Sequence, residues 1–175
     1  VFRDLTRKNP ESIFDNLFLK MLKTAHDNYG MKVQLNVFYR IDFYYGDDEF
    51  TLKDMTDKYK KEFETVSYWL KFGFHSKQEF PDYPYINADY EDIKANLDAI
   101  KNEIFRFAGE KSFARACVPH WLPISKDGCR ALYDGGIKLL SVSLEDLREY
   151  NGDPFSLPYG HAQRLLSHRR VELFT

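Results

Sequence analysis

The chain has 175 residues, a length that suits one domain with an interior large enough to fold without disulfide bonds. Its formal net charge of −2 lacks the overall basic field expected of a nucleic-acid-binding protein. No apolar run reaches the roughly 18 residues of a membrane-spanning helix. Aromatic residues make up 17% of the chain, which indicates a thick core or a cleft that binds flat ligands or sugars.

Hydrophobic periodicity predicts alternating helices and strands in chain order. The spacing of Ile13, Leu17 and Met21 is helical, Thr51 with Asp54 resembles a capping box, and the signal weakens beyond residue 143. The predicted elements are a helix over 12–29, a strand over 32–39, a helix over 57–66, a strand over 69–76, a helix over 89–107, a strand over 113–119, a helix over 125–133, a strand over 137–142 and a final strand over 169–174.

This alternation is typical of parallel strands joined by helices. The first two predicted strands carry a polar or small face opposite the aliphatic one, with Gln34 and Asn36 on one strand and Gly73 and His75 on the next. An open doubly wound sheet would have two apolar faces, so a closed (β/α) barrel fits the pattern better. Because such folds usually open on a strand and this chain opens on a helix, we expect residues 1–175 to form one barrel domain that lacks its first strand.

Polar side chains gather where the predicted strands end, and parallel α/β folds place ligands and catalytic residues at those ends. His75 ends the second strand and Glu79 follows four residues later, so a turn could return its carboxylate to the imidazole. This pair could bind a divalent metal, or act as a base with its orienting partner. His120, beside Trp121 after the third strand, is a weaker candidate for the same chemistry. A histidine that caps strand-end carbonyls, with an exposed glutamate, is the alternative interpretation.

Other reactive groups form no comparable pattern. The sequence has no Gly-x-Ser-x-Gly elbow, no Gly-rich phosphate loop and no Cys-x-x-Cys metal motif. Cys117 and Cys129 fall in a predicted strand and a predicted helix, so we expect buried free thiols, which favours a reducing compartment such as the cytoplasm. His161 lies in a predicted loop that gives it no defined position.

The segment from Trp69 to Glu79 resembles the second motif of the polysaccharide deacetylase superfamily. In that motif a strand ends in His-Ser or His-Thr, here His75-Ser76, and a second histidine follows three residues later. This chain has Glu79 at the position of the second histidine. Residues 117–137 resemble the third-motif region and the segment that follows it.

The resemblance extends as a layout over about residues 12–143 and implies a distorted, seven-stranded (β/α) barrel. It also implies metal-dependent hydrolysis of N- or O-acetyl groups on carbohydrates, in which a metal-bound water attacks the acetyl carbonyl and an aspartate acts as the base. On this basis we expect His75 and Glu79 to hold a divalent ion such as zinc, with His120 beside them as a catalytic residue. The aromatic and basic residues expected to line a cleft for a carbohydrate or related small substrate are Tyr39, Arg40, Tyr83, Tyr85 and Trp121.

Three departures from the family pattern leave two other hypotheses open. The aspartate pair of the first motif would precede Val1, Glu79 replaces a histidine, and the third-motif arginine falls at Cys117. The first alternative is a catalytically inactive barrel that binds carbohydrate or serves as a structural domain. The second is a glycosidase that uses Asp42 and Glu79 as carboxylates across a cleft. Neither a nucleic acid nor a membrane is an expected partner, and the oligomeric state is not predicted.

Overall fold

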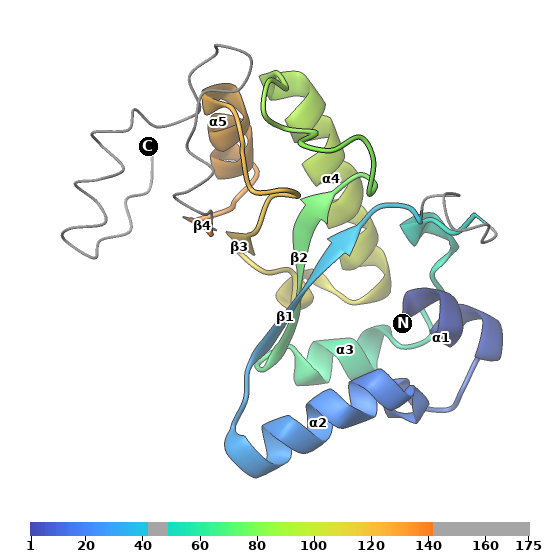
Figure 1. Cartoon of the computed structure of the whole chain (residues 1–175). Coiled ribbons are helices and arrows are strands. Elements are labelled where there is room, and N and C mark those ends of the chain that lie inside the picture. The colour runs from blue at the N-terminus through green and yellow to red at the C-terminus, as the bar shows by residue number, and fades with distance from the viewer. Residues whose placement is uncertain (42–48, 142–175) are drawn as a thin grey trace.

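The structure is a computed structural model that describes residues 1–41 and 49–141 (Figure 1). It has a mixed α/β fold, which confirms the predicted class at that level. The helices are α1 (Phe2–Lys8), α2 (Leu17–Tyr29), α3 (Lys60–Val66), α4 (Tyr90–Phe107) and α5 (Lys126–Asp134), with short 3₁₀ turns η1 (Ile13–Asp15), η3 (Leu52–Asp54) and η4 (Glu110–Ser112). The strands are β1 (Val33–Phe38), β2 (Leu70–Ser76), β3 (Ala116–Cys117) and β4 (Leu139–Leu140).

Most predicted elements are found, with shifts at their ends. The strands predicted over 113–119 and 137–142 shorten to two residues each in β3 and β4, and α1 was not predicted. The final strand predicted over 169–174 lies outside the described residues. Within the described ranges, none of the helices combines the length and the apolar character needed to cross a bilayer.

The first predicted helix is interrupted at Asn16, whose side chain accepts a hydrogen bond from the backbone N–H of Leu19 at 3.2 Å and caps α2. This cap sets which side of the helix is buried. Leu19 and Leu22 enter the core, whereas Leu17 is 81% exposed and Met21 57% exposed. The prediction that Leu17 and Met21 share the apolar face is therefore wrong, because it assumed one continuous helix.

The strands run parallel and follow one another in chain order. β1 pairs with β2 from Val33 opposite Leu70 onward, and β3 pairs with β4. A parallel bridge between Phe72 and Phe113 joins β2 to the segment that enters β3, where the N–H of Ala114 donates to the carbonyl oxygen of Phe72 at 2.8 Å. Each strand therefore neighbours the next, as crossover helices on a parallel sheet require.

The strands do not close into a barrel within the described residues. They form two separate two-stranded sheets, and the Phe72–Phe113 bridge lies between them. The short pairing of β3 with β4, over two residues each, leaves this side of the sheet with few ladder hydrogen bonds. The part of the chain that the structure describes thus has the mixed α/β class, with two small parallel sheets and no closed barrel.

Among the described helices, α4 contributes the most buried side chains. Its inward side chains recur every three or four residues and all are fully buried: Ile93, Leu97, Ile100, Ile104 and Phe107. This face packs against β2, and α5 lies along α4 (Figure 1). The ring of Phe72 on β2 makes edge contacts with Phe2 at 5.3 Å and Phe63 at 5.1 Å, so part of the aromatic excess fills the core.

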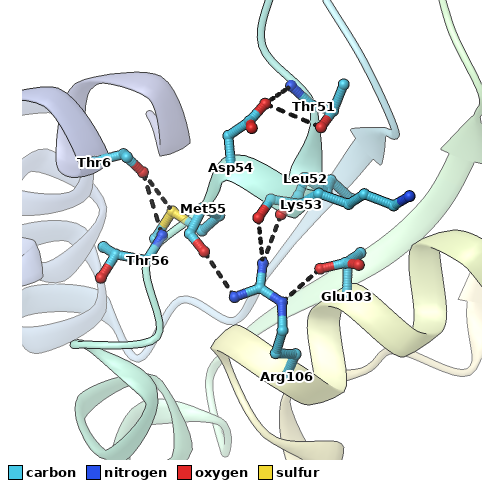
Figure 2. Close-up of polar contacts among 9 residues, drawn as sticks. All are labelled: Thr6, Thr51, Leu52, Lys53, Asp54, Met55, Thr56, Glu103 and Arg106. Atoms are coloured by element: carbon cyan, nitrogen blue, oxygen red, sulfur yellow. Dashed lines mark hydrogen bonds and ion pairs between the residues drawn. The ribbon is translucent and has the colours of Figure 1, made fainter.

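Arg106 on α4 forms hydrogen bonds with the segment that follows β1 (Figure 2). Its Nη1 donates to the carbonyl oxygen of Met55 at 2.8 Å, its Nη2 donates to that of Leu52 at 2.8 Å, and its Nε donates to Glu103 at 2.6 Å. The N–H of Leu52 in turn donates to the carbonyl oxygen of Tyr39 at 2.8 Å. Arg106 therefore helps to position the chain that follows β1.

Candidate functional site

Two imidazole rings meet near the end of β2 and just beyond β3. His75 stands near the end of β2, and His120 follows β3 by three residues. The backbone N–H of His120 donates to the carbonyl oxygen of His75 at 3.2 Å, and the Nδ1 of His120 lies 3.0 Å from the Nε2 of His75. The sequence expectation that His75 and His120 lie near one another thus has a direct geometric counterpart.

Each ring is oriented by a backbone carbonyl at its outer nitrogen. The Nδ1 of His75 lies 2.6 Å from the carbonyl oxygen of Val118, and the Nε2 of His120 lies 2.8 Å from that of Glu79. A carbonyl oxygen can only accept, so both outer nitrogens carry a hydrogen. In neutral rings the two inner nitrogens then both present lone pairs to each other, and only a shared proton or a bound cation makes their 3.0 Å separation favourable.

Burial lowers the pKa of His75 below its ordinary value of 6.5, because desolvation disfavours the charged ring. The hydrogen bond to the carbonyl of Val118 raises the pKa and the neighbouring His120 lowers it, but desolvation is the larger effect. His75 is therefore neutral near pH 7, with its Nε2 available as a lone-pair donor.

The two inner imidazole nitrogens are of a type that can bind a divalent metal. Metal-binding histidines characteristically donate their other ring N–H to a carbonyl or carboxylate, as His75 and His120 do here. Imidazole nitrogens are common ligands of zinc and similar ions, so these two could contribute to such a site. Among residues 1–41 and 49–141, no group of three or more His, Cys, Asp or Glu side chains is placed to hold a metal.

Glu79 lies on the other edge of His120. Its carboxylate Oε1 is 3.8 Å from the Nε2 of His120, the nitrogen that also bonds the carbonyl oxygen of Glu79 itself. His75 contacts the opposite ring nitrogen. His120 therefore stands between the two residues that the sequence paired, and the Glu79 carboxylate does not face the inner nitrogens.

Aromatic rings surround the histidine pair. Phe38, at the end of β1, makes edge contacts with His75 at 4.9 Å and with His120 at 5.0 Å. Trp121 is 44% exposed, and its ring lies 5.6 Å from His120 and 5.7 Å from Tyr83. Trp121 and Tyr83 therefore form an aromatic surface beside the pair.

The backbone is strained at this same edge. Tyr83, Trp121 and Leu122 have positive φ angles of 51°, 59° and 76°, which bulky residues rarely adopt. Backbone strain of this kind persists where surrounding structure enforces it, and it clusters at functional sites.

Tyr85 departs from the sequence expectation. It is 2% exposed, and its hydroxyl accepts a hydrogen bond from the backbone N–H of Lys77 at 3.1 Å. It therefore supports the turn after β2 from inside the core. The prediction that Tyr85 lines a cleft is wrong, because alternation along the Pro-rich loop does not reveal which ring turns inward.

A cavity of about 510 Å³ opens beside β1 and includes Tyr39 and Arg40. Phe38 and Glu79, which contact the histidine pair, also line it. Among the described residues, the Nε of Arg40 is a buried side-chain nitrogen with no hydrogen-bond partner. The cavity thus lies beside two residues that contact the histidines, whereas its lining includes neither His75 nor His120.

Two contributors were missed by the sequence interpretation. Phe38 shares the strand face of Asn36, so parity could have placed it beside His75 on the neighbouring strand. The carbonyl of Val118 could not be found this way, because its position depends on the path of the chain after β3. Asp42 and His161 lie outside the described residues.

The cysteines behave as predicted for buried free thiols. Cys117 is fully buried, and burial raises the pKa of its thiol. Cys129 is partly buried, and burial raises its pKa to about 11. Neither thiol is ionised near neutral pH, so neither is prepared to act as a nucleophile.

No protein-family model, no curated protein and no solved structure matches this chain. The chemistry of the site therefore follows from its own residues and distances.

Proposed function

We propose that this chain is a divergent relative of the polysaccharide deacetylases that removes acetyl groups, as amides or esters, from a carbohydrate or related substrate with a divalent metal ion. The observation that carries the proposal is the pair of inner imidazole nitrogens of His75 and His120, 3.0 Å apart, with both outer nitrogens held by carbonyl oxygens. Such an arrangement of two neutral rings is favourable when a cation lies between their lone pairs.

Each residue of the site has a proposed role. The Nε2 of His75 and the Nδ1 of His120 would hold the ion, which, when bound, polarises a carbonyl and lowers the pKa of a water molecule. Glu79, the second ligand expected from the family resemblance, contacts the outer edge of His120 through its carbonyl oxygen, and its carboxylate, 36% exposed, lies 3.8 Å from the Nε2 of His120. Trp121 and Tyr83 would bind the face of a sugar ring, which aromatic side chains do through apolar C–H contacts.

We further propose that the described strands form an arc of a barrel. The side chain of Gln34 on β1 crosses Gly73 on β2 and donates to the carbonyl oxygen of Ala116 on β3 at 3.0 Å. A side chain that reaches over the neighbouring strand to the next one indicates a concave sheet face. This same face carries His75, as the inner face of a barrel would.

The test is metal retention by the full chain. After incubation with zinc or cobalt and dialysis, the wild type should keep about one ion per chain, and His75→Ala and His120→Ala should lose it. His26→Ala is the matched control, because the Nδ1 of His26 also bonds a backbone carbonyl, that of Met31 at 2.8 Å, far from the pair in sequence. Acetate release from an acetylated oligosaccharide should follow metal content. A wild-type protein that keeps no metal would overturn the proposal.

The second candidate function is a carbohydrate-binding barrel without catalysis. The observation that favours it is the lack of a third metal-binding side chain near the pair among the described residues. In this case, sugar binding would be the same in the wild type and His75→Ala, and neither protein would release acetate.

A further inference from the structure

Tyr85 buries a hydroxyl group beside the turn that follows β2. The residue is 2% exposed, its ring lies 5.6 Å from that of Phe74 on β2, and its hydroxyl accepts a hydrogen bond from the backbone N–H of Lys77 at 3.1 Å. A phenylalanine ring would fill the same space without a polar group to desolvate. The contribution of the hydroxyl therefore lies in the part of the turn that it holds.

That part of the turn carries the carbonyl group that orients His120. Lys77 lies two residues before Glu79, whose carbonyl oxygen is 2.8 Å from the Nε2 of His120. On the other side of Glu79, the Nε2 of Gln78 donates to the carbonyl oxygen of Phe80 at 2.5 Å. The Glu79 carbonyl thus lies between one hydrogen bond at Lys77 and another at Phe80.

The main chain of Tyr85 holds the second segment of the site. Its carbonyl oxygen accepts a hydrogen bond from the N–H of Ser125 at 3.0 Å. Ser125 caps α5 and ends the loop that carries His120 and Trp121. Tyr85 therefore contacts both segments that meet at His120, the turn through its hydroxyl and the loop through its main chain. A phenylalanine at position 85 would keep the second contact and lose only the first.

We infer that Tyr85 is a positioning residue, whose hydroxyl holds the turn so that the Glu79 carbonyl orients the ring of His120. With its Nε2–H donating to that carbonyl, His120 directs its Nδ1 at His75. This inference rests on the proposed function for the role of Nδ1 as a metal ligand, whereas the orientation of the ring does not depend on it. Groups that directly orient metal-binding histidines contribute roughly 10- to 100-fold to metal affinity.

The first measurement is the zinc affinity of the full chain, determined by competition with a chromophoric chelator. Because Tyr85 acts through the turn, Tyr85→Phe should bind zinc at least about threefold more weakly than the wild type. Tyr59→Phe is the matched control, since Tyr59 is also 2% exposed and its hydroxyl donates to the carbonyl oxygen of Pro10 at 2.6 Å, before η1. It should bind zinc like the wild type, although urea denaturation should show a similar loss of stability in both variants.

The second measurement is the imidazole N–H signals of the metal-free, ¹⁵N-labelled chain by nuclear magnetic resonance. The Nε2–H of His120 and the Nδ1–H of His75 are both held by carbonyl oxygens. In Tyr85→Phe, the His120 signal should shift or disappear through faster exchange with water. The His75 signal should stay, because Val118 and not the turn holds that ring. Both signals should be unchanged in Tyr59→Phe.

Equal zinc affinities of the wild type and Tyr85→Phe would overturn the inference. So would a His120 signal that is unchanged in Tyr85→Phe, or an equal loss of the His75 and His120 signals, which would indicate a general loosening of the fold. If the wild type binds no zinc while Tyr85→Phe alters the His120 signal alone, the proposed metal chemistry fails and the positioning role of Tyr85 stands.

Discussion

His75 owes its position to strand parity and its orientation to one backbone carbonyl. Parity places it on the same face of β2 as Gly73, which the sequence predicts. The carbonyl of Val118 then fixes which ring nitrogen carries the hydrogen and directs Nε2 at His120. The strand face of His75 follows from the sequence. The orientation of its ring does not, because it depends on the path of the loop after β3, which hydrophobic periodicity does not reveal.

The lowered pKa of His75 predicts a pH-dependent stability. Between the folded-state pKa and 6.5, the unfolded chain binds a proton that the folded chain does not. The contribution is therefore fully present above about pH 6.5 and is lost as the pH falls through the folded-state pKa. Urea unfolding of the metal-free chain from pH 8 to pH 5 should show a steeper loss of unfolding free energy in the wild type than in His75→Gln.

The comparison with His75→Gln isolates this group from the carboxylates and the other histidines that also titrate. Parallel pH profiles for the two proteins would show that His75 has the same pKa in both states. They would contradict the desolvation that the structure gives to its ring.

The residues around His120 show where sequence patterns stop being informative. Trp121 and Leu122 adopt positive φ angles that are typical of glycine or asparagine, and neither residue type is present there to predict them. Their conformation is imposed by the packing of the loop. Trp121 could be assigned to a strand end from the sequence, but its angle to His120 and Tyr83 could not.

At the scale of elements, Gly73 leaves the space through which a side chain of β1 reaches β3 across β2. A Cβ atom at this position would meet the Nε2 of Gln34 and lie 2.9 Å from the Oδ1 of Asn36. Gln34 needs this space, because its amide donates both to Asn36 at 2.7 Å and to Ala116 at 3.0 Å. The glycine thus leaves room for the Gln34 side chain. The alternation of the strand predicts the face on which Gly73 lies, but not this role.

Gly73→Ala should therefore destabilise the fold by about 1–3 kcal/mol through overpacking. In the background of Gln34→Ala, where the crossing side chain is absent, the same substitution should cost about 1 kcal/mol less. A double-mutant cycle measured by urea denaturation tests this coupling. Strictly additive effects would mean that Gln34 does not pass over Gly73.

Arg106 makes a comparable side-chain link between α4 and η3 (Figure 2). Its two terminal nitrogens donate to the carbonyl oxygens of Leu52 and Met55. The sequence does not predict these contacts, because it places Arg106 only on the polar face of a helix. Arg106→Met should lower the unfolding free energy by about 2–3 kcal/mol, because charged hydrogen bonds to carbonyl groups are lost.

Arg130→Met provides the control, because Arg130 is exposed on α5, and its unfolding free energy should stay within about 0.5 kcal/mol of the wild type. Chemical denaturation of both variants gives the comparison. An Arg106→Met protein as stable as Arg130→Met would show that the hydrogen bonds at η3 contribute no net stability.

For the whole molecule, the alternation of helices and strands was predictable because each helix carries its apolar residues at helical spacing and each long strand alternates. The division of the described strands into two small sheets was not, because it depends on hydrogen bonds between strands far apart in the chain. The short strands β3 and β4 leave that closure undetermined by local pattern. The aromatic excess divides between the core around Phe72 and the surface beside His120.

The central claim is that the inner nitrogens of His75 and His120 bind one metal ion. X-ray absorption at the zinc edge of the zinc-loaded full chain tests it most directly. We expect imidazole scattering from two histidines in the wild type and in His26→Ala, and from one histidine in any zinc that His120→Ala retains. A zinc spectrum without imidazole scattering, or one that is unchanged in both His75→Ala and His120→Ala, would contradict it.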